Sequence, residues 1–357
     1  MLTVRLSLST LVVLFLALFS TIGAFVEAAP QRQNNGNGQG GNRGGNRGGG
    51  NKNSKGNGNG GQTAQQQAAQ KPQGISKAKD GSTILDMTVT VNDLPLRFKI
   101  SGPANQFTTA SGVNGAQQAP GTQGNLGLNV LLHGDGGQSF FDFPNQGVQQ
   151  NLAGVAVLAP DPNLFWGGGA GLNRVDGVAH AQAVNDLVLN ELPKVMAINT
   201  SNVFFTGVSG GSLLLSGFFI PQHMTNFQGT GVLLNCAGLP PQVGFVDANA
   251  VAKSTRIHFQ STQKELQNLQ GAIRESVTAY EKLASDAGLN NGQINALQTV
   301  DNSPNGGHCA FDGKGFVSGI QLMADNFANI MQGGNGNVNG IGNVLKGVVG
   351  NENLQFA

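Results

Sequence analysis

The chain has 357 residues, of which 11% are charged, and its formal net charge at pH 7 is +1. A charge balance this close to zero gives no general attraction to nucleic acids or to anionic membranes. The length allows one large domain or two domains of ordinary size.

Residues 1–28 have the composition of a secretory signal peptide. Arg5 is followed by an apolar run over residues 11–19 and then by small residues around Ala28. The apolar run is shorter than the roughly 20 residues that span a bilayer. We therefore expect cleavage and export of a protein without a membrane span.

Residues 29–74 are rich in Gly, Asn and Gln, and their Arg and Lys residues face no acidic residue in the segment. With almost no apolar side chain to bury, the segment is predicted to be a disordered basic arm. Its Arg-Gly-Gly repeats are similar to RNA-binding segments, but an exported protein meets little RNA. We expect no nucleic-acid partner, and at most loose contact with polyanionic cell-wall material.

Residues 75–332 are predicted to form the folded domain, and residues 333–357, again rich in Gly and Asn, a C-terminal tail. The domain opens with "ILDMTVTVNDLPLRFKIS", a hairpin that turns at Asn92 and Asp93. Further strands are expected at "LGLNVLLHG", "GVAVLAP", "NVFFTG", "GVLLNCAG", "RIHFQST" and "INALQTV".

Helical spacing of apolar residues occurs over residues 178–196, 265–287 and 316–331, and a further helix is expected to begin at Ser212. Leu266 and Val317 belong to the faces expected to point inward. A leading hairpin followed by alternating strands and helices predicts an α/β fold. Its sheet would be mostly parallel, with helices on both faces.

The pentapeptide Gly207-Val208-Ser209-Gly210-Gly211 joins an expected strand to an expected helix. This is the pattern of the nucleophile elbow, in which glycines let strand and helix approach while the serine hydroxyl stands clear. The pentapeptide alone says little in a chain with 55 glycines, but its strand–helix context makes Ser209 the candidate nucleophile.

A second motif, "HGDGG" at residues 133–137, ends an earlier strand. An acyl-transfer site needs N–H donors aimed at the developing oxyanion. We expect one donor from the main chain of Gly210 and the other from Asp135 or Gly136. His133 is expected to order this loop through hydrogen bonds.

The general base should follow the serine along the chain. Of the three histidines that do, His258 lies inside an expected strand, and His223 lies near a helix end. His308 lies on a loop after the last expected strand, where it can take the Ser209 proton and return it to the leaving group.

In the motifs "LLHGDGG", "VDGVAHAQAVNDLV", "GVSGG" and "GGHCAF", the chain resembles the α/β-hydrolase superfamily. Within it, the resemblance is to secreted esterases of the polyhydroxybutyrate-depolymerase and feruloyl-esterase kind. The resemblance implies an esterase that uses Ser209 and His308, with Gly210 and the Asp135 region as oxyanion donors.

The chain departs from that pattern at the triad acid. The position that best matches the family's aspartate is Lys264, with Glu265 adjacent to it. Glu265 is one candidate acid, although a carboxylate here also suits a helix N-terminus. Asp301 is the second candidate, and a site without an acid is the third possibility.

Cys236 and Cys309 follow expected strands at the same sheet edge and either form one disulfide or remain free thiols. The expected strands are not adjacent, so a disulfide requires their loops to lean together. Asn199 begins a glycosylation sequon. No zinc spacing and no phosphate loop is present, so we expect no metal and no cofactor.

Trp166, the only tryptophan, is expected either to line an acyl or aromatic pocket or simply to be packed. Two functions remain open from the sequence. The first is a secreted serine hydrolase that cleaves a carboxylic ester through an acyl-enzyme. The alternative is a secreted, non-catalytic protein of hydrolase-like fold that binds at a cell wall or host surface.

Overall fold

A central sheet organises the residues described by the computed structural model, which are 63–142 and 148–357. The predicted signal peptide and most of the predicted arm lie outside these residues. The strand order along the main path of the sheet is β1-β2-β3-β6-β4-β7-β8-β9-β10-β13, with β5 paired to β6. The strands are β1 (Gly74–Lys77), β2 (Thr83–Val91), β3 (Leu94–Gly102), β4 (Gly127–Leu132), β5 (Val148–Gln149), β6 (Leu152–Leu158), β7 (Val203–Val208), β8 (Gly231–Asn235), β9 (Arg256–Gln260), β10 (Gln298–Asp301) and β13 (Lys346–Gly347).

The predicted hairpin is confirmed as β2 and β3, which pair antiparallel from Thr83↔Gly102 to Val91↔Leu94. Asn92 and Asp93 both have positive φ, at 50° and 63°. A two-residue hairpin turn of this kind needs positive φ at both positions, and Asn and Asp tolerate it best after glycine.

The strands from β6 and β4 through β10 run parallel to one another, as the alternating sequence predicts. Alternate residues of a strand point to opposite faces, and the core divides accordingly. Val130, Phe205 and Val232 belong to one apolar cluster, whereas Leu131 and Leu233 belong to another. Both faces of the sheet are therefore covered.

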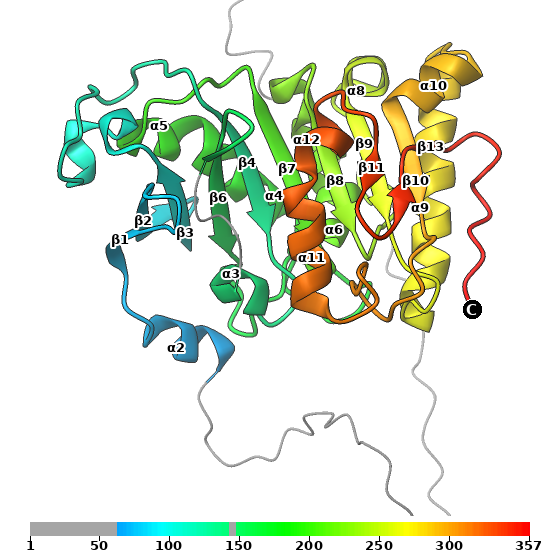
Figure 1. Cartoon of the computed structure of the whole chain (residues 1–357), viewed down its shortest axis with the longest axis horizontal. Helices are drawn as coiled ribbons and strands as arrows, with labels where there is room; N and C mark the ends of the chain where they lie inside the picture. The colour runs from blue at the N-terminus through cyan, green and yellow to red at the C-terminus, as the bar shows by residue number, and fades with distance from the viewer. Residues whose placement is uncertain (1–62, 143–147) are drawn as a thin grey trace, which may run out of the picture. The chain divides into compact units, whose positions relative to one another are not determined.

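The helices cover these faces, and Figure 1 shows α11 and α12 crossing in front of β7 and β8. Among the described residues, no helix is long and apolar enough to span a membrane. The α- and π-helical segments are α2 (Ala64–Ala69), α3 (Gln138–Asp142), α4 (Gly177–Asp186), η3 (Leu187–Glu191), α5 (Leu192–Val195), α6 (Gly210–Leu214), η4 (Leu215–Phe219), α7 (Ile220–His223), α8 (Ala248–Ser254), α9 (Gln267–Asp286), α10 (Asn291–Leu297), α11 (Phe316–Asp325) and α12 (Phe327–Met331).

The N-terminal boundary predicted for the domain, residue 75, is corrected by helix α2, which lies before it and contacts the sheet. Helix α2 starts with a capping box between Thr63 and Gln66. Ala68 is buried, and its carbonyl accepts a hydrogen bond of 2.8 Å from Arg97. The last residues of the predicted arm therefore pack on the sheet.

The predicted tail is also part of the fold. Strand β13 pairs antiparallel with β10, and Lys346 forms an ion pair of 2.9 Å with Asp301. Val344, Val348 and Leu354 are buried. A few apolar side chains spaced among glycines are enough to attach this segment to the edge of the sheet.

Three details of the sequence prediction are corrected by the structure. Residues 294–297, expected in a strand, form the end of α10, and only Gln298–Asp301 are extended. Leu266 and Val317, expected to point inward, are 47% and 39% exposed. Leu266 is the N-cap of α9 and Val317 lies in the first turn of α11, so neither reaches the packed face of its helix.

Candidate active site

Ser209 stands at the turn between β7 and α6, in a strained conformation with φ 50° and ψ −112°. Its flanking glycines are required by close contacts. A Cβ on Gly207 would lie 2.6 Å from the main chain of Ser212, and a Cβ on Gly211 would lie 2.1 Å from the carbonyl oxygen of Leu132. Both distances are too short for any other residue, so strand β4, the turn and the helix are held together by glycine.

The imidazole of His308 faces this serine. Its Nε2 lies 3.0 Å from Ser209 Oγ, which is hydrogen-bond distance. His308 follows β10 on a loop and is separated from Ser209 by 99 residues along the chain. The fold therefore brings together the two residues that the sequence proposed as nucleophile and base.

Glu265 lies on the other side of the same ring, and its Oε1 is hydrogen-bonded to His308 Nδ1. Its side chain is fully buried. The same oxygen accepts the N–H of Leu266 at 2.8 Å, and Ser261 donates its hydroxyl to the other oxygen at 3.4 Å. These donors fix the carboxylate with one edge toward the imidazole.

The alternative acid, Asp301, is engaged elsewhere. Its carboxylate forms the ion pair with Lys346 and accepts hydrogen bonds from Gln260 and Ser303, each at 3.0 Å. Of the two candidate acids, Glu265 is therefore the one that contacts His308.

The loop after β4 faces the serine turn. A Cβ built on Gly134 would lie 3.4 Å from the Cβ of Ser209. A Cβ built on Gly210 would lie 2.0 Å from Asp135 Oδ1 and 3.3 Å from the Asp135 nitrogen, so these two residues are in contact. Gly136 does not fit as a donor to the site, because its N–H donates to the carbonyl of Leu164 at 3.1 Å.

His133 orders this loop, as expected. Its Nε2 accepts the N–H of Ala159 at 2.9 Å, and its Nδ1–H donates to the carbonyl of Gly134 at 2.6 Å. Burial lowers the pKa of His133 to about 4, so the ring stays neutral at pH 7. Trp166 is completely buried and packs near His133, which favours the packed alternative for this residue.

Cys236 and Cys309 form a disulfide, with their Cα atoms 5.1 Å apart. Both residues have positive φ, at 53° and 58°, and the N–H of Cys236 donates to the carbonyl of Gln260, the last residue of β9, at 2.7 Å. The sulfurs lie close to the His308 ring, but because they are bonded to each other they offer no thiolate to a metal. Asn199, the predicted glycosylation site, lies half-buried beside the turn that precedes β7.

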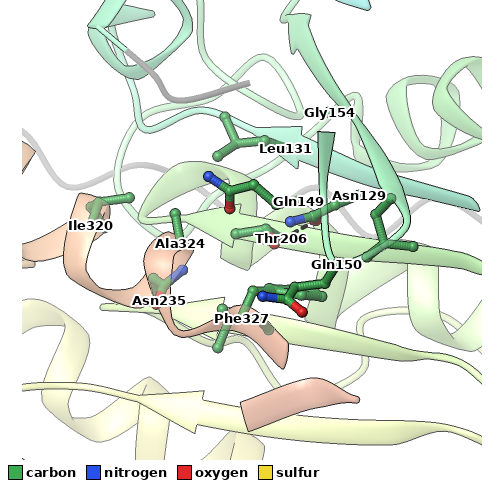
Figure 2. Close-up of a pocket in the computed structure, with 12 residues that line it drawn as sticks. Asn129, Leu131, Gln149, Gln150, Gly154, Thr206, Asn235, Ile320, Ala324 and Phe327 are labelled. Carbon is green, nitrogen blue, oxygen red and sulfur yellow. Dashed lines mark hydrogen bonds between the residues drawn. The ribbon is translucent and has the colours of Figure 1, made fainter. Parts of the chain in front are cut away.

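A small cavity lies apart from these residues, on the face of the sheet that α11 and α12 cover (Figure 2). Its volume is about 30 Å³, and none of its lining residues is charged. Asn129 accepts a hydrogen bond from Thr206 beside it at 2.8 Å. The buried amide of Asn235 has no hydrogen-bond partner among the described residues. No sequence signal marked this cavity.

No family model and no curated protein matches the chain. It is similar in structure to a thermostable esterase, with 16% identity, a TM-score of 0.40 and coverage of 56% of this chain and 52% of that one. The chain thus spans about half the length of that protein.

Two further similar structures cover more of both chains. For esterases from Rhizomucor miehei the identity is 12% and the TM-score 0.43, over 75% of this chain and 88% of that one. For a feruloyl esterase module from Clostridium thermocellum the identity is 10% and the TM-score 0.40, over 65% of this chain and 84% of that one. The activities in these names belong to those proteins. This chain has the α/β-hydrolase fold, as its strand order and the turn that joins β7, Ser209 and α6 show.

Proposed function

We propose that the protein is a serine hydrolase that cleaves a carboxylic ester through an acyl-enzyme intermediate. One observation carries the proposal: Ser209 Oγ lies 3.0 Å from His308 Nε2, while the other ring nitrogen of His308 is hydrogen-bonded to the buried Glu265. A nucleophile, a base and a group that orients the base are the parts that activation of a serine requires.

In the first half-reaction His308 accepts the Ser209 proton at Nε2 as Oγ attacks the carbonyl carbon of the ester. Glu265 holds the proton on Nδ1, so that Nε2 is free to act as base, and it stabilises the imidazolium that forms. The protonated His308 then donates its Nε2 proton to the departing alcohol.

The developing oxyanion needs donors that are already in place. The main-chain N–H groups of Gly210 and Asp135 suit this role, because the two residues are in contact beside Ser209. Gly210 also begins helix α6, whose N-terminal end carries partial positive charge.

In the second half-reaction a water molecule replaces the alcohol. His308 takes a proton from this water, the resulting hydroxide attacks the acyl carbon, and His308 returns the proton to Ser209 as the acid leaves.

We also propose that the protein is exported. Residues 1–28 have the pattern of a signal peptide, and a disulfide is characteristic of oxidising compartments.

The test compares Ser209→Ala with Ser285→Ala, which changes an exposed serine in α9. On p-nitrophenyl acetate, Ser209→Ala should lose activity by roughly 10⁴-fold or more, with an unchanged melting temperature, while Ser285→Ala matches the unmodified protein. A fluorophosphonate probe should label Ser209 in the unmodified protein. Full activity in Ser209→Ala contradicts the proposal, and an unmodified protein that neither hydrolyses nor labels favours the non-catalytic alternative.

A further inference from the structure

Asp135 has two parts that act on the proposed oxyanion site in opposite ways. Its main-chain N–H is a proposed donor, whereas its carboxylate is a negative charge close to Gly210. A bare carboxylate at this place would repel the oxyanion, because charges a few ångströms apart interact strongly where water is partly excluded. The Asp135 side chain is 28% exposed, so solvent screens it only in part.

Arg174 pairs with this carboxylate in a bidentate geometry. Its Nη1 and Nη2 lie 2.8 Å and 2.7 Å from the two oxygens of Asp135. The arginine side chain is 1% exposed, and its Nη1 also donates to the carbonyl of Trp166 at 3.0 Å. The pair therefore joins the loop after β4 to the loop after β6, and a two-bond pair fixes orientation as well as distance.

We propose that Arg174 is a positioning residue of the active site, which holds the Asp135 N–H toward the oxyanion and cancels the charge of the Asp135 carboxylate. The inference rests on the proposed function. Since both effects act on the charge that develops in the transition state, loss of Arg174 should lower kcat and leave KM nearly unchanged.

The chain offers a matched control in Arg97 and Asp86. This pair is also buried and bidentate, with distances of 2.7 Å and 2.8 Å, but it lies on β3 and β2, away from Ser209. Removing either arginine leaves a partly buried carboxylate without its partner, 28% exposed for Asp135 and 13% for Asp86, which destabilises a protein. Only the Arg174 pair should also affect catalysis.

The experiment measures kcat and KM on p-nitrophenyl acetate at a temperature where all variants are folded. Arg174→Met should lower kcat by about 10- to 100-fold, and Arg97→Met by no more than about twofold, although both lower the melting temperature. Adding Asp135→Asn to Arg174→Met removes the unpaired charge and should restore part of kcat. Equal kcat in Arg174→Met and Arg97→Met, or no recovery in the double variant, overturns the proposal.

If Arg174→Met fails to fold, the comparison uses double variants in which both charges of a pair are removed. Arg174→Met/Asp135→Asn should then have at least about fivefold lower kcat than Arg97→Met/Asp86→Asn, and equal values overturn the proposal. Ser209→Ala separates this result from the proposed function. An inactive Ser209→Ala together with unaffected Arg174 variants rejects the role of Arg174 alone, whereas an active Ser209→Ala rejects the serine mechanism itself.

Discussion

Glu265 and Asp301 are both buried carboxylates near the C-terminal edge of the sheet, but their partners differ. Glu265 contacts His308, whereas Asp301 contacts Lys346. Without its acid a catalytic histidine loses its preferred tautomer, which costs about 10⁴ in kcat in a well-studied serine protease. We expect Glu265→Gln to lower kcat by roughly 10²–10⁴-fold.

The matched variant Asp301→Asn removes a buried charge from the Lys346 ion pair. It should lower the melting temperature and change kcat by less than about threefold, because Asp301 does not contact the imidazole. Steady-state kinetics and thermal unfolding of the two variants decide the question. A larger loss of kcat in Asp301→Asn than in Glu265→Gln would assign the acid role to Asp301.

The site residues that could be predicted from the sequence are those that lie in a recognisable local pattern. Ser209 lies in a short motif between a strand and a helix, and His308 is the histidine on the loop after the last strand. Glu265 remained one of several alternatives for the acid, because it lies one residue after Lys264, the position that best matches the aspartate of the family. Arg174 carried no signal, since its partner Asp135 is 39 residues away and only the folded loops bring them together.

At the scale of elements, the disulfide joins the end of β8 to the residue that follows His308. It closes a loop with a sequence separation of 73, which by the loop-entropy relation contributes roughly 4 kcal/mol to the free energy of unfolding. Reduction under native conditions should lower activity severalfold before the far-ultraviolet circular dichroism changes, because the His308 loop loosens first.

The control for this prediction is Cys236→Ala/Cys309→Ala, whose activity should not respond to reductant. Activity of the unmodified protein that falls only together with its circular dichroism signal would show that the disulfide stabilises the domain without holding the histidine loop in place.

Helix α2 illustrates why composition misled at the domain boundary. Its sequence has no large apolar residue, yet Ala68 is buried, and Gln65 donates to the carbonyl of Pro160 at 2.9 Å. A chain that begins at Gly74 loses these contacts and the Arg97 bond to Ala68, and should melt about 3–6 °C lower than a chain that begins at Gln62. Equal melting temperatures would mean that α2 adds nothing to the stability of the domain.

At the scale of the whole molecule, the central strands themselves could be predicted because each is an apolar run that ends at a turn, whereas their order in the sheet, with β6 between β3 and β4, was not predicted. The packing of the two ends of the folded chain could not be predicted, because each end contacts the domain through few side chains. Lys346 reaches Asp301, and the N–H of Ala357 donates to the carbonyl of Gln263, two residues before Glu265. Such contacts depend on where distant segments meet, and the local sequence does not encode that.

The free energy of unfolding of the domain should depend on pH, because folding buries histidines. Burial lowers the pKa of both His133 and His258 to about 4, from an ordinary value of 6.5. Between pH 6.5 and pH 4 the unfolded chain therefore binds protons at these two sites that the folded chain does not. Stability should fall as the pH falls through this range, by up to about 1.4 kcal/mol per pH unit for each proton.

His258→Gln tests this linkage, because it removes one of the two sites. His258 lies in β9, within hydrogen-bond distance of Thr299 and Gln260, so a polar replacement keeps part of that network. Urea unfolding of the variant between pH 5 and pH 6 should show a dependence on pH that is shallower by about one proton than that of the unmodified protein. An unchanged slope would mean that His258 does not stay neutral in the folded chain over this pH range.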